Sequence, residues 1–387
     1  MFRFFIFFTL LVSAQFAFGR TWTDSLGRQF EGELIRVEGE QVFLKVSGLQ
    51  RSFKFSQLSS SDQRWLSRGG GAPAPTAASS TKKEPKRSSF TPSGQGQPKQ
   101  INIDQSVPVT RIETNPAEKR WVYASPNFEF VCNKDLGLAK VREFVWMFEG
   151  VWSFCEQWPV HLPRLQAREQ VRMRTLLVET EEDYVRLGGP PGSAGVYMPA
   201  RDLVLIPFSS LRLDRGRRGR QQEYVLRHEI THQLMKGQTQ QAAWFIEGSA
   251  EYVASVPFAV NRVLADKHSE AVVDFLIARN VPPGKFRSEG RMMKLTSLEK
   301  FMTNSYSGFQ RTPLAYPYGL VVFYYFAKLD GNKDGASLRA YVDALHRDKS
   351  EAEARKLLLR GRSWDQLEAD MTRAWGLKGL KLKFTDT

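Results

Sequence analysis

The stretch "RHEITHQL", residues 227 to 234, sets Glu229 directly after His228 and places His232 four positions beyond that first histidine. It lies in a segment without Pro or Gly, residues 221 to 235, whose recurring apolar residues are Leu226, Ile230 and Leu234. This pattern predicts a helix with a buried apolar stripe and with both imidazoles together on another face. Two such imidazoles can occupy two corners of a tetrahedral Zn²⁺ site, and the intervening glutamate is then the general base of an HExxH arrangement.

A third ligand can be sought by its spacing from the second histidine. A metzincin would need Gly and His where this chain has Met235 and Gln238, which excludes that subclass. Further along, "WFIEGSAEY" supplies Glu247 and Glu251, four positions apart and therefore on one face of a second predicted helix. Either carboxylate would complete a His, His, Glu site with one position open to water, as catalytic zinc requires. Spacing alone does not choose between them.

Taken together, "HEITH" and "WFIEGSAEY" resemble the gluzincin side of the thermolysin-like clan, and most closely the bacterial peptidase MA-like domains. The resemblance extends over about residues 120 to 376 and implies a zincin-like fold. It also implies that Glu247 is the third zinc ligand, and that Glu251 accepts a hydrogen bond from a ligating imidazole and fixes its tautomer. The activity it implies is hydrolysis of a peptide or protein substrate.

Two further segments add to this resemblance. "GVYMPARDLVLIP", residues 195 to 207, resembles the hairpin before the zinc helix, whose edge strand would pair with an extended substrate. "LAYPYGLVVFYYF", residues 314 to 326, resembles the tyrosine-bearing start of a later helix. By this match Tyr316 is the first candidate, and Tyr318 the second, to donate a hydrogen bond to the tetrahedral oxyanion. The alternative is that both tyrosines only pack in an amphipathic helix.

The order of the elements predicts the fold class of residues 109 to 387. A strand pair, a long helix, a single strand and a hairpin come first, and the chain beyond the HExxH helix is mostly helical. Strands first and helices later favour the α+β class. We therefore expect a mixed sheet with an edge strand, the HExxH helix and a mainly helical C-terminal part.

The N-terminal residues, 1 to 19, have the pattern of a secretory signal peptide. A positive residue, Arg3, precedes an apolar run, and small residues lie just before a cleavage point at Arg20. The run is shorter than the roughly 20 residues that a spanning helix needs, although a retained anchor is the alternative. We predict no other membrane segment, and expect an exported protein, in the periplasm or outside the cell.

Residues 20 to 67 predict a small β-barrel, because "FEGELIRV" and "QVFLKV" alternate between apolar and polar residues. With its closing "FSQLSSSDQRWL", this unit resembles the SH3-like Sla-type homology domain, which implies a docking role and no chemistry. Residues 68 to 108 are rich in Pro, Gly, Ser and Lys, which predicts a disordered linker.

The net charge of +14 favours anionic partners. The segment "RLDRGRRGRQQ", residues 212 to 222, is either a solvated loop or a cationic rim for acidic substrates or cell-envelope polymers. An envelope polymer or protein could also bind the SH3-like module. No aromatic residues lie between the arginines, which argues against nucleic acid.

Several alternatives stay open at this point. The chain could be a non-catalytic zinc-containing scaffold protein of the cell envelope, or a zinc hydrolase of a non-peptide bond, since HExxH fixes the water and not the scissile group. Cys132 and Cys155 are either one disulfide or two buried thiols. The other three histidines are isolated in the sequence and are expected to have no catalytic role; they are His161, His268 and His346.

Overall fold

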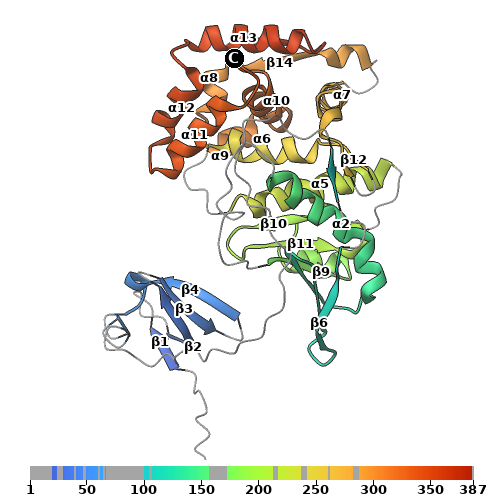
Figure 1. Cartoon of the computed structure of the whole chain (residues 1–387), viewed down its shortest axis with the longest axis vertical. Helices are drawn as coiled ribbons and strands as arrows, with labels where there is room; N and C mark the ends of the chain where they lie inside the picture. Colours follow the sequence, from blue (N-terminus) through green and yellow to red (C-terminus); the bar gives the residue numbers. More distant parts are fainter. Residues whose placement is uncertain are drawn as a thin grey trace, which may run out of the picture. The chain divides into compact units, whose positions relative to one another are not determined.

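The computed structural model describes residues 20–23, 29–38, 41–46, 49–59, 62–63, 66, 100–103, 107–156, 172–211, 217–236, 242–259, 262–281 and 287–385. The chain divides into two compact units, Met1–Ser89 and Phe90–Thr387, and each is described by itself (Figure 1). The predicted signal peptide, most of the predicted linker and the loop 212–216 lie outside the described residues. Among the helices of the described part, none has the length and apolar character needed to cross a membrane.

The first unit contains a four-stranded antiparallel sheet in which consecutive strands are neighbours. Its elements are β1 (Arg20–Thr23), β2 (Gln29–Glu38), β3 (Gln41–Val46), β4 (Leu49–Lys54) and the 3-10 helix η1 (Phe55–Gln57). Every second residue of β3 is buried, and these residues pack with Trp22, whose indole N–H donates to the carbonyl of Gly32 (2.9 Å). The sequence alternation therefore predicted β2 and β3 correctly, whereas the SH3-like barrel stays a prediction.

The second unit begins before residue 109. A small antiparallel sheet is formed by β5 (Ile101–Asn102), β12 (Phe258–Ala259) and β13 (Arg262–Val263). Ile101 and Ile103 are buried in the core of the unit. The prediction of a disordered linker over all of residues 68 to 108 is therefore wrong at its C-terminal end, because apolar residues there pack against the unit.

A six-stranded mixed sheet forms one layer of the second unit. Its strands are β6 (Thr110–Asn115), β7 (Arg120–Ala124), β8 (Phe128–Cys132), β9 (Met173–Val178), β10 (Val196–Met198) and β11 (Leu203–Pro207). They lie in the order β10-β11-β9-β8-β7-β6, and β8, β9 and β11 are parallel. Strand β10 pairs antiparallel with β11 and lies at one edge, as the predicted hairpin requires.

Helices pack on both faces of this sheet. They are α2 (Gly137–Glu156), α4 (Glu181–Arg186) and α5 (Arg217–Leu234). Met173 and Leu177 of β9 belong to the main core together with α2 and α5, whereas Val178 clusters with Tyr184 of α4. Alternate residues of one strand thus face different helices, which fixes the register of the sheet.

Helices dominate the remainder of the unit (Figure 1). They are α6 (Ala243–Ala254), α7 (His268–Asn280), α8 (Leu298–Met302), α9 (Tyr306–Arg311), α10 (Ala315–Lys328), α11 (Ala336–His346), α12 (Glu351–Leu359) and α13 (Trp364–Gly376), with 3-10 helices η2 (Phe208–Leu211), η3 (Ala265–Lys267) and η4 (Arg287–Arg291). Strands β14 (Met292–Thr296) and β15 (Lys381–Thr385) form a parallel pair. The mixed sheet followed by helices agrees with the predicted α+β class.

Helices α6 and α10 cross at two glycines. A Cβ atom on Gly248 would lie 2.5 Å from the carbonyl oxygen of Gly319, closer than such atoms can approach. The absence of side chains at both positions therefore lets the two backbones meet. This contact sets the position of Glu247, which precedes Gly248 on α6, relative to the first turn of α10.

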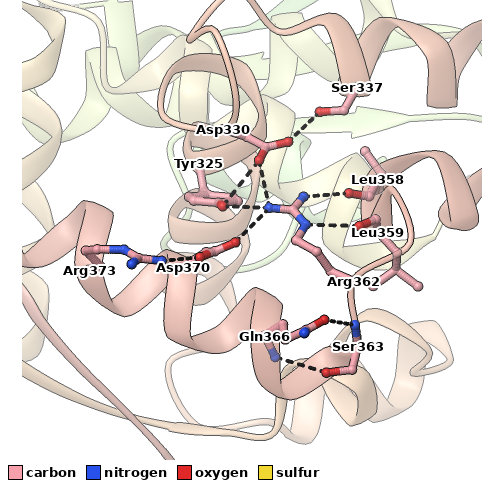
Figure 2. A network of polar contacts seen from close by, with 10 residues as sticks. All are labelled: Tyr325, Asp330, Ser337, Leu358, Leu359, Arg362, Ser363, Gln366, Asp370 and Arg373. Atoms are coloured by element: carbon pink, nitrogen blue, oxygen red, sulfur yellow. Dashed lines mark hydrogen bonds and ion pairs between the residues drawn. The ribbon is translucent and has the colours of Figure 1, made fainter.

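A partly buried arginine joins the C-terminal helices (Figure 2). Arg362 donates to the carboxylates of Asp330 (2.9 Å) and Asp370 (3.2 Å) and to the hydroxyl of Tyr325 (3.2 Å). Its other N–H groups donate to the carbonyls of Leu358 and Leu359. All of these bonds lie within the helical part, so this network holds α10, α12 and α13 together.

Candidate metal centre

The first two predicted ligands lie on α5. Leu226, Ile230 and Leu234 have no exposed surface and anchor the helix in the core, as their spacing predicted. On another face, the Nε2 atoms of His228 and His232 are 2.9 Å apart. Their ring planes are nearly perpendicular, with an interplanar angle of 85°. Both nitrogens therefore face one point beside the helix.

The third predicted ligand comes from α6. Oε2 of Glu247 is 3.2 Å from Nε2 of His228 and 3.4 Å from Nε2 of His232. Ligand atoms bound tetrahedrally at about 2.0–2.1 Å from one ion are about 3.3 Å apart. The described residues thus bring together His228, His232 and Glu247 as a group that could hold a metal ion. Two imidazoles and a carboxylate form a donor set that suits zinc.

A tyrosine holds the other oxygen of the third ligand. The hydroxyl of Tyr306, at the start of α9, donates to Oε1 of Glu247 (2.5 Å). The carboxylate is almost fully buried, with 3% of its side chain exposed. Tyr306 was not predicted from the sequence, because "NSYSGF" contains no motif and lies 59 positions from the glutamate. Only the folded chain brings the two together.

The second glutamate of α6 contacts the back of the first imidazole. Oε1 of Glu251 is 3.1 Å from Nδ1 of His228, the contact that the family resemblance implied. Its other oxygen, Oε2, accepts a hydrogen bond from the hydroxyl of Tyr224, one turn earlier on α5. A hydrogen bond at Nδ1 leaves the Nε2 lone pair of His228 available for a metal. Tyr224 is a second residue that the sequence did not reveal.

Burial and hydrogen bonding shift the pKa values of His228 and Glu247 in opposite directions. Burial alone would lower the pKa of His228, but its contacts with Glu247 and Glu251 outweigh burial and raise that pKa well above the usual value. Burial would raise the pKa of Glu247, but hydrogen bonds with both histidines lower it. A divalent cation must therefore compete with a proton for His228, since ligating imidazoles are neutral.

The predicted general base lies between the ligands and the edge strand. Oε2 of Glu229 accepts a hydrogen bond from the backbone N–H of Tyr197 on β10 (2.6 Å). Glu229 and His228 line one cavity of about 480 Å³. The base and the first ligand therefore share one opening, and the base is also bonded to the sheet edge.

The two tyrosines of α10 have different surroundings. Tyr316 lines the same cavity, and its ring centroid is 6.1 Å from that of His228. Burial and the nearby carboxylates raise the pKa of Tyr316 to about 12, so its hydroxyl stays a donor at neutral pH. Tyr318, the second candidate, is fully buried, stacks on Phe301 and donates to the carbonyl of Thr296 (2.9 Å). The structure therefore places Tyr318 in the core and away from the cavity.

The remaining histidines lie elsewhere. His268 is buried, and its Nε2 is 3.0 Å from Oγ of Ser255. Its ring packs against Tyr252 and Tyr324, at centroid distances of 4.5 Å and 5.4 Å. His346 ends α11, and His161 lies outside the described residues. The expectation that His268 and His346 are outside the site agrees with these positions.

Both cysteines are buried free thiols, which decides between the two alternatives left open for Cys132 and Cys155. Burial raises the pKa of the Cys132 thiol to about 12, so it stays protonated at neutral pH. Neither thiol belongs to the candidate metal group within the described residues.

Comparisons with known proteins leave the family resemblance untested. No protein-family model matches this chain, and no curated protein matches it either. The chemistry of the site must therefore be argued from its own residues.

Proposed function

We propose that this protein is a zinc-dependent metallopeptidase of the gluzincin type. The observation that supports this most strongly is the convergence of Nε2 of His228, Nε2 of His232 and Oε2 of Glu247, at mutual distances of 2.9 to 3.4 Å. Three protein ligands leave a fourth position for water, which is the composition of catalytic zinc sites. A bound zinc ion would polarise a water molecule and a substrate carbonyl.

The remaining chemistry belongs to the side chains. Glu229 removes a proton from the attacking water and passes it to the leaving amine as the peptide bond breaks. Tyr316 donates a hydrogen bond to the developing oxyanion from the wall of the same cavity. Glu251 orients the imidazole of His228. Each role matches a contact or a position described above.

An extended peptide fits the site better than other scissile groups. Strand β10 lies at the edge of the mixed sheet, and an extended peptide can add to the edge of a sheet. Its Tyr197 already contacts the base through the backbone N–H. A peptide that pairs with β10 would therefore lie beside Glu229. This position favours peptide hydrolysis over hydrolysis of a small non-peptide ester or amide.

The metal is tested first, by elemental analysis of the purified full chain and of Glu247→Ala. We expect one equivalent of zinc in the wild type and a large loss in the variant. Glu182→Ala, at an exposed position on α4, is the matched control and should keep its zinc. An unaffected Glu247→Ala variant would show that these residues are not the metal site.

The base is tested by Glu229→Gln with a mixture of unstructured peptides as substrate. The amide oxygen can still accept from Tyr197, so the variant should keep zinc and lose about 10²- to 10⁴-fold in rate. Chelation should abolish wild-type cleavage, and added zinc should restore it. A zinc-loaded wild type that cleaves no peptide would instead favour a structural zinc site or another scissile bond.

We also infer that the chain is exported and that its N-terminal unit docks an envelope polymer or protein. The apolar N-terminal run of the sequence supports export, and the resemblance of residues 20 to 67 to an SH3-like module supports docking. N-terminal sequencing of the protein from the producing cell tests the first: a mature end at Arg20 is expected. An uncleaved N-terminus would contradict it.

A further inference from the structure

The cavity beside the metal centre is lined by an exposed arginine that has no ion-pair partner among the described residues. Arg279, in the last turn of α7, lines the same cavity of about 480 Å³ as His228 and Glu229. The described residues that line this cavity include no other Arg or Lys. None of the ion pairs and hydrogen bonds given by the described part of the chain involves Arg279. No acceptor among the described residues therefore competes with a ligand for its guanidinium.

Aromatic rings position this guanidinium. Its Cζ atom is 5.1 Å from the ring centroid of Phe275 and 5.9 Å from that of Tyr224. The two rings stack at a centroid distance of 4.7 Å, with an angle of 15° between their planes. A cation held by ring faces keeps its N–H groups for other partners. The stack thus orders Arg279 without using its hydrogen-bonding capacity.

The carboxylates of the cavity already have other partners. Glu251 binds His228 and Tyr224, and Glu229 accepts from the backbone of Tyr197. In the described part of the chain neither carboxylate forms an ion pair with Arg279, although all three side chains line the cavity. An incoming anion would therefore find, beside the reacting groups, one arginine whose charge neither carboxylate neutralises in an ion pair.

We propose that Arg279 is a substrate-binding residue that takes a carboxylate of the peptide, either its C-terminal carboxylate or an Asp or Glu side chain. A guanidinium matches a carboxylate with two parallel N–H···O bonds, which gives both affinity and orientation. The net charge of +14 adds long-range attraction for anionic peptides. This inference rests on the proposed peptidase function and specifies its substrate class.

The test measures binding in a protein that does not turn over. The full chain carrying Glu229→Gln is loaded with zinc and incubated with four pools of acetylated hexapeptides. The first pool has free carboxyl ends and no acidic side chains, and the second is the same pool with amidated ends. The third and fourth are amidated and contain one Glu or one Gln. Peptides retained on ultrafiltration are quantified by mass spectrometry, with and without a second substitution of Arg279.

If Arg279 binds the C-terminal carboxylate, we expect about tenfold greater retention of the first pool than of the second. If it binds an acidic side chain, we expect about tenfold greater retention of the third pool than of the fourth. Either result supports the proposal. Arg279→Gln should remove the difference, and Arg279→Lys should keep part of it. Arg142→Gln, at an exposed position on α2, should leave it unchanged. Equal retention of all pools, no retention of any, or a preference that survives Arg279→Gln overturns the proposal. This assay measures binding and requires no turnover. A wild type that cleaves no peptide would therefore contradict the proposed peptidase function without deciding whether Arg279 binds a carboxylate.

Discussion

Tyr306 donates its hydroxyl to Oε1 of Glu247 (2.5 Å), while Oε2 of the same carboxylate faces the two imidazoles of α5. The two oxygens of one side chain therefore have different partners. Burial, and the hydrogen bond to Glu247, raise the pKa of Tyr306, so the hydroxyl remains a donor at any physiological pH. A carboxylate held in this way presents one oxygen to a metal ion in a fixed direction.

Replacement of Tyr306 by Phe should weaken metal binding. Loss of a hydrogen bond to a ligating side chain typically costs 10- to 100-fold in metal affinity, and we expect a change of about this size. Competition for zinc with a chromophoric chelator measures it. Tyr316→Phe makes the same chemical change in the same site without touching a ligand, and should keep wild-type affinity. Equal affinities of the wild type and Tyr306→Phe would show that the bond does not support the site.

The two tyrosines of α10 should respond differently to the loss of their hydroxyls. Tyr316→Phe should lower kcat by about 10²- to 10³-fold with unchanged zinc content, because it removes an oxyanion donor. Tyr318→Phe leaves the carbonyl of Thr296 without its donor, and should cost about 1–3 kcal/mol of unfolding free energy with kcat unchanged. Steady-state kinetics and urea unfolding separate the two effects. A loss of turnover only in Tyr318→Phe would reverse the assignment.

The glycine contact between α6 and α10 should tolerate no side chain. In Gly248→Ala the new methyl group would lie 2.5 Å from the backbone oxygen of Gly319, so the helices must separate. We expect a loss of about 1–3 kcal/mol in stability, typical of overpacking, together with weaker zinc binding through the neighbouring Glu247. Gly376→Ala is the matched control, since a Cβ atom there meets nothing within 4 Å. Urea unfolding of both variants should show a loss only in the first.

The stability of the fold should decline in mild acid because of His268. Burial, and the positive charge of Lys328, lower the pKa of His268 to about 3 in the folded protein, against about 6.5 for an unfolded chain. The unfolded state therefore binds more protons between these two values, and stability falls as the pH drops below about 6.5. The loss from this one group approaches 1.4 kcal/mol per pH unit.

Urea unfolding of the wild type and of His268→Gln, at pH 7.5 and pH 5.0, measures this contribution. We expect the stability advantage of the wild type to shrink by about 2 kcal/mol at the lower pH, because only the wild type must desolvate a protonated imidazole. The metal-site residues titrate in both proteins, so their contributions cancel when the two unfolding free energies are subtracted. If the wild type is more stable than His268→Gln by the same amount at both pH values, His268 is not the cause of the loss of stability in acid.

The sequence predicted the parts of the site that follow from helical spacing. His228 and His232 are one turn apart, and so are Glu247 and Glu251, so the face that each pair shares could be derived before the fold was known. The choice of Glu247 as the ligand came from a resemblance, and its position beside both imidazoles agrees with that choice.

The parts that the sequence did not predict depend on long-range packing. Tyr306 meets its partner across 59 positions, and no local pattern encodes such a distance. Tyr316 and Tyr318 are two positions apart on α10, so they point to different sides, but only the packing on Phe301 shows which side is the core. Strand β5 was hidden because its apolar residues follow a long polar, Pro-rich stretch.

The two buried thiols have a practical consequence. Cys132 and Cys155 are the only cysteines in the chain, and both are free, so no step in its folding requires an oxidant or a disulfide isomerase. Because burial also raises the pKa of both thiols, they present little thiolate to oxidants. A reducing environment therefore has no disulfide of these two cysteines to break.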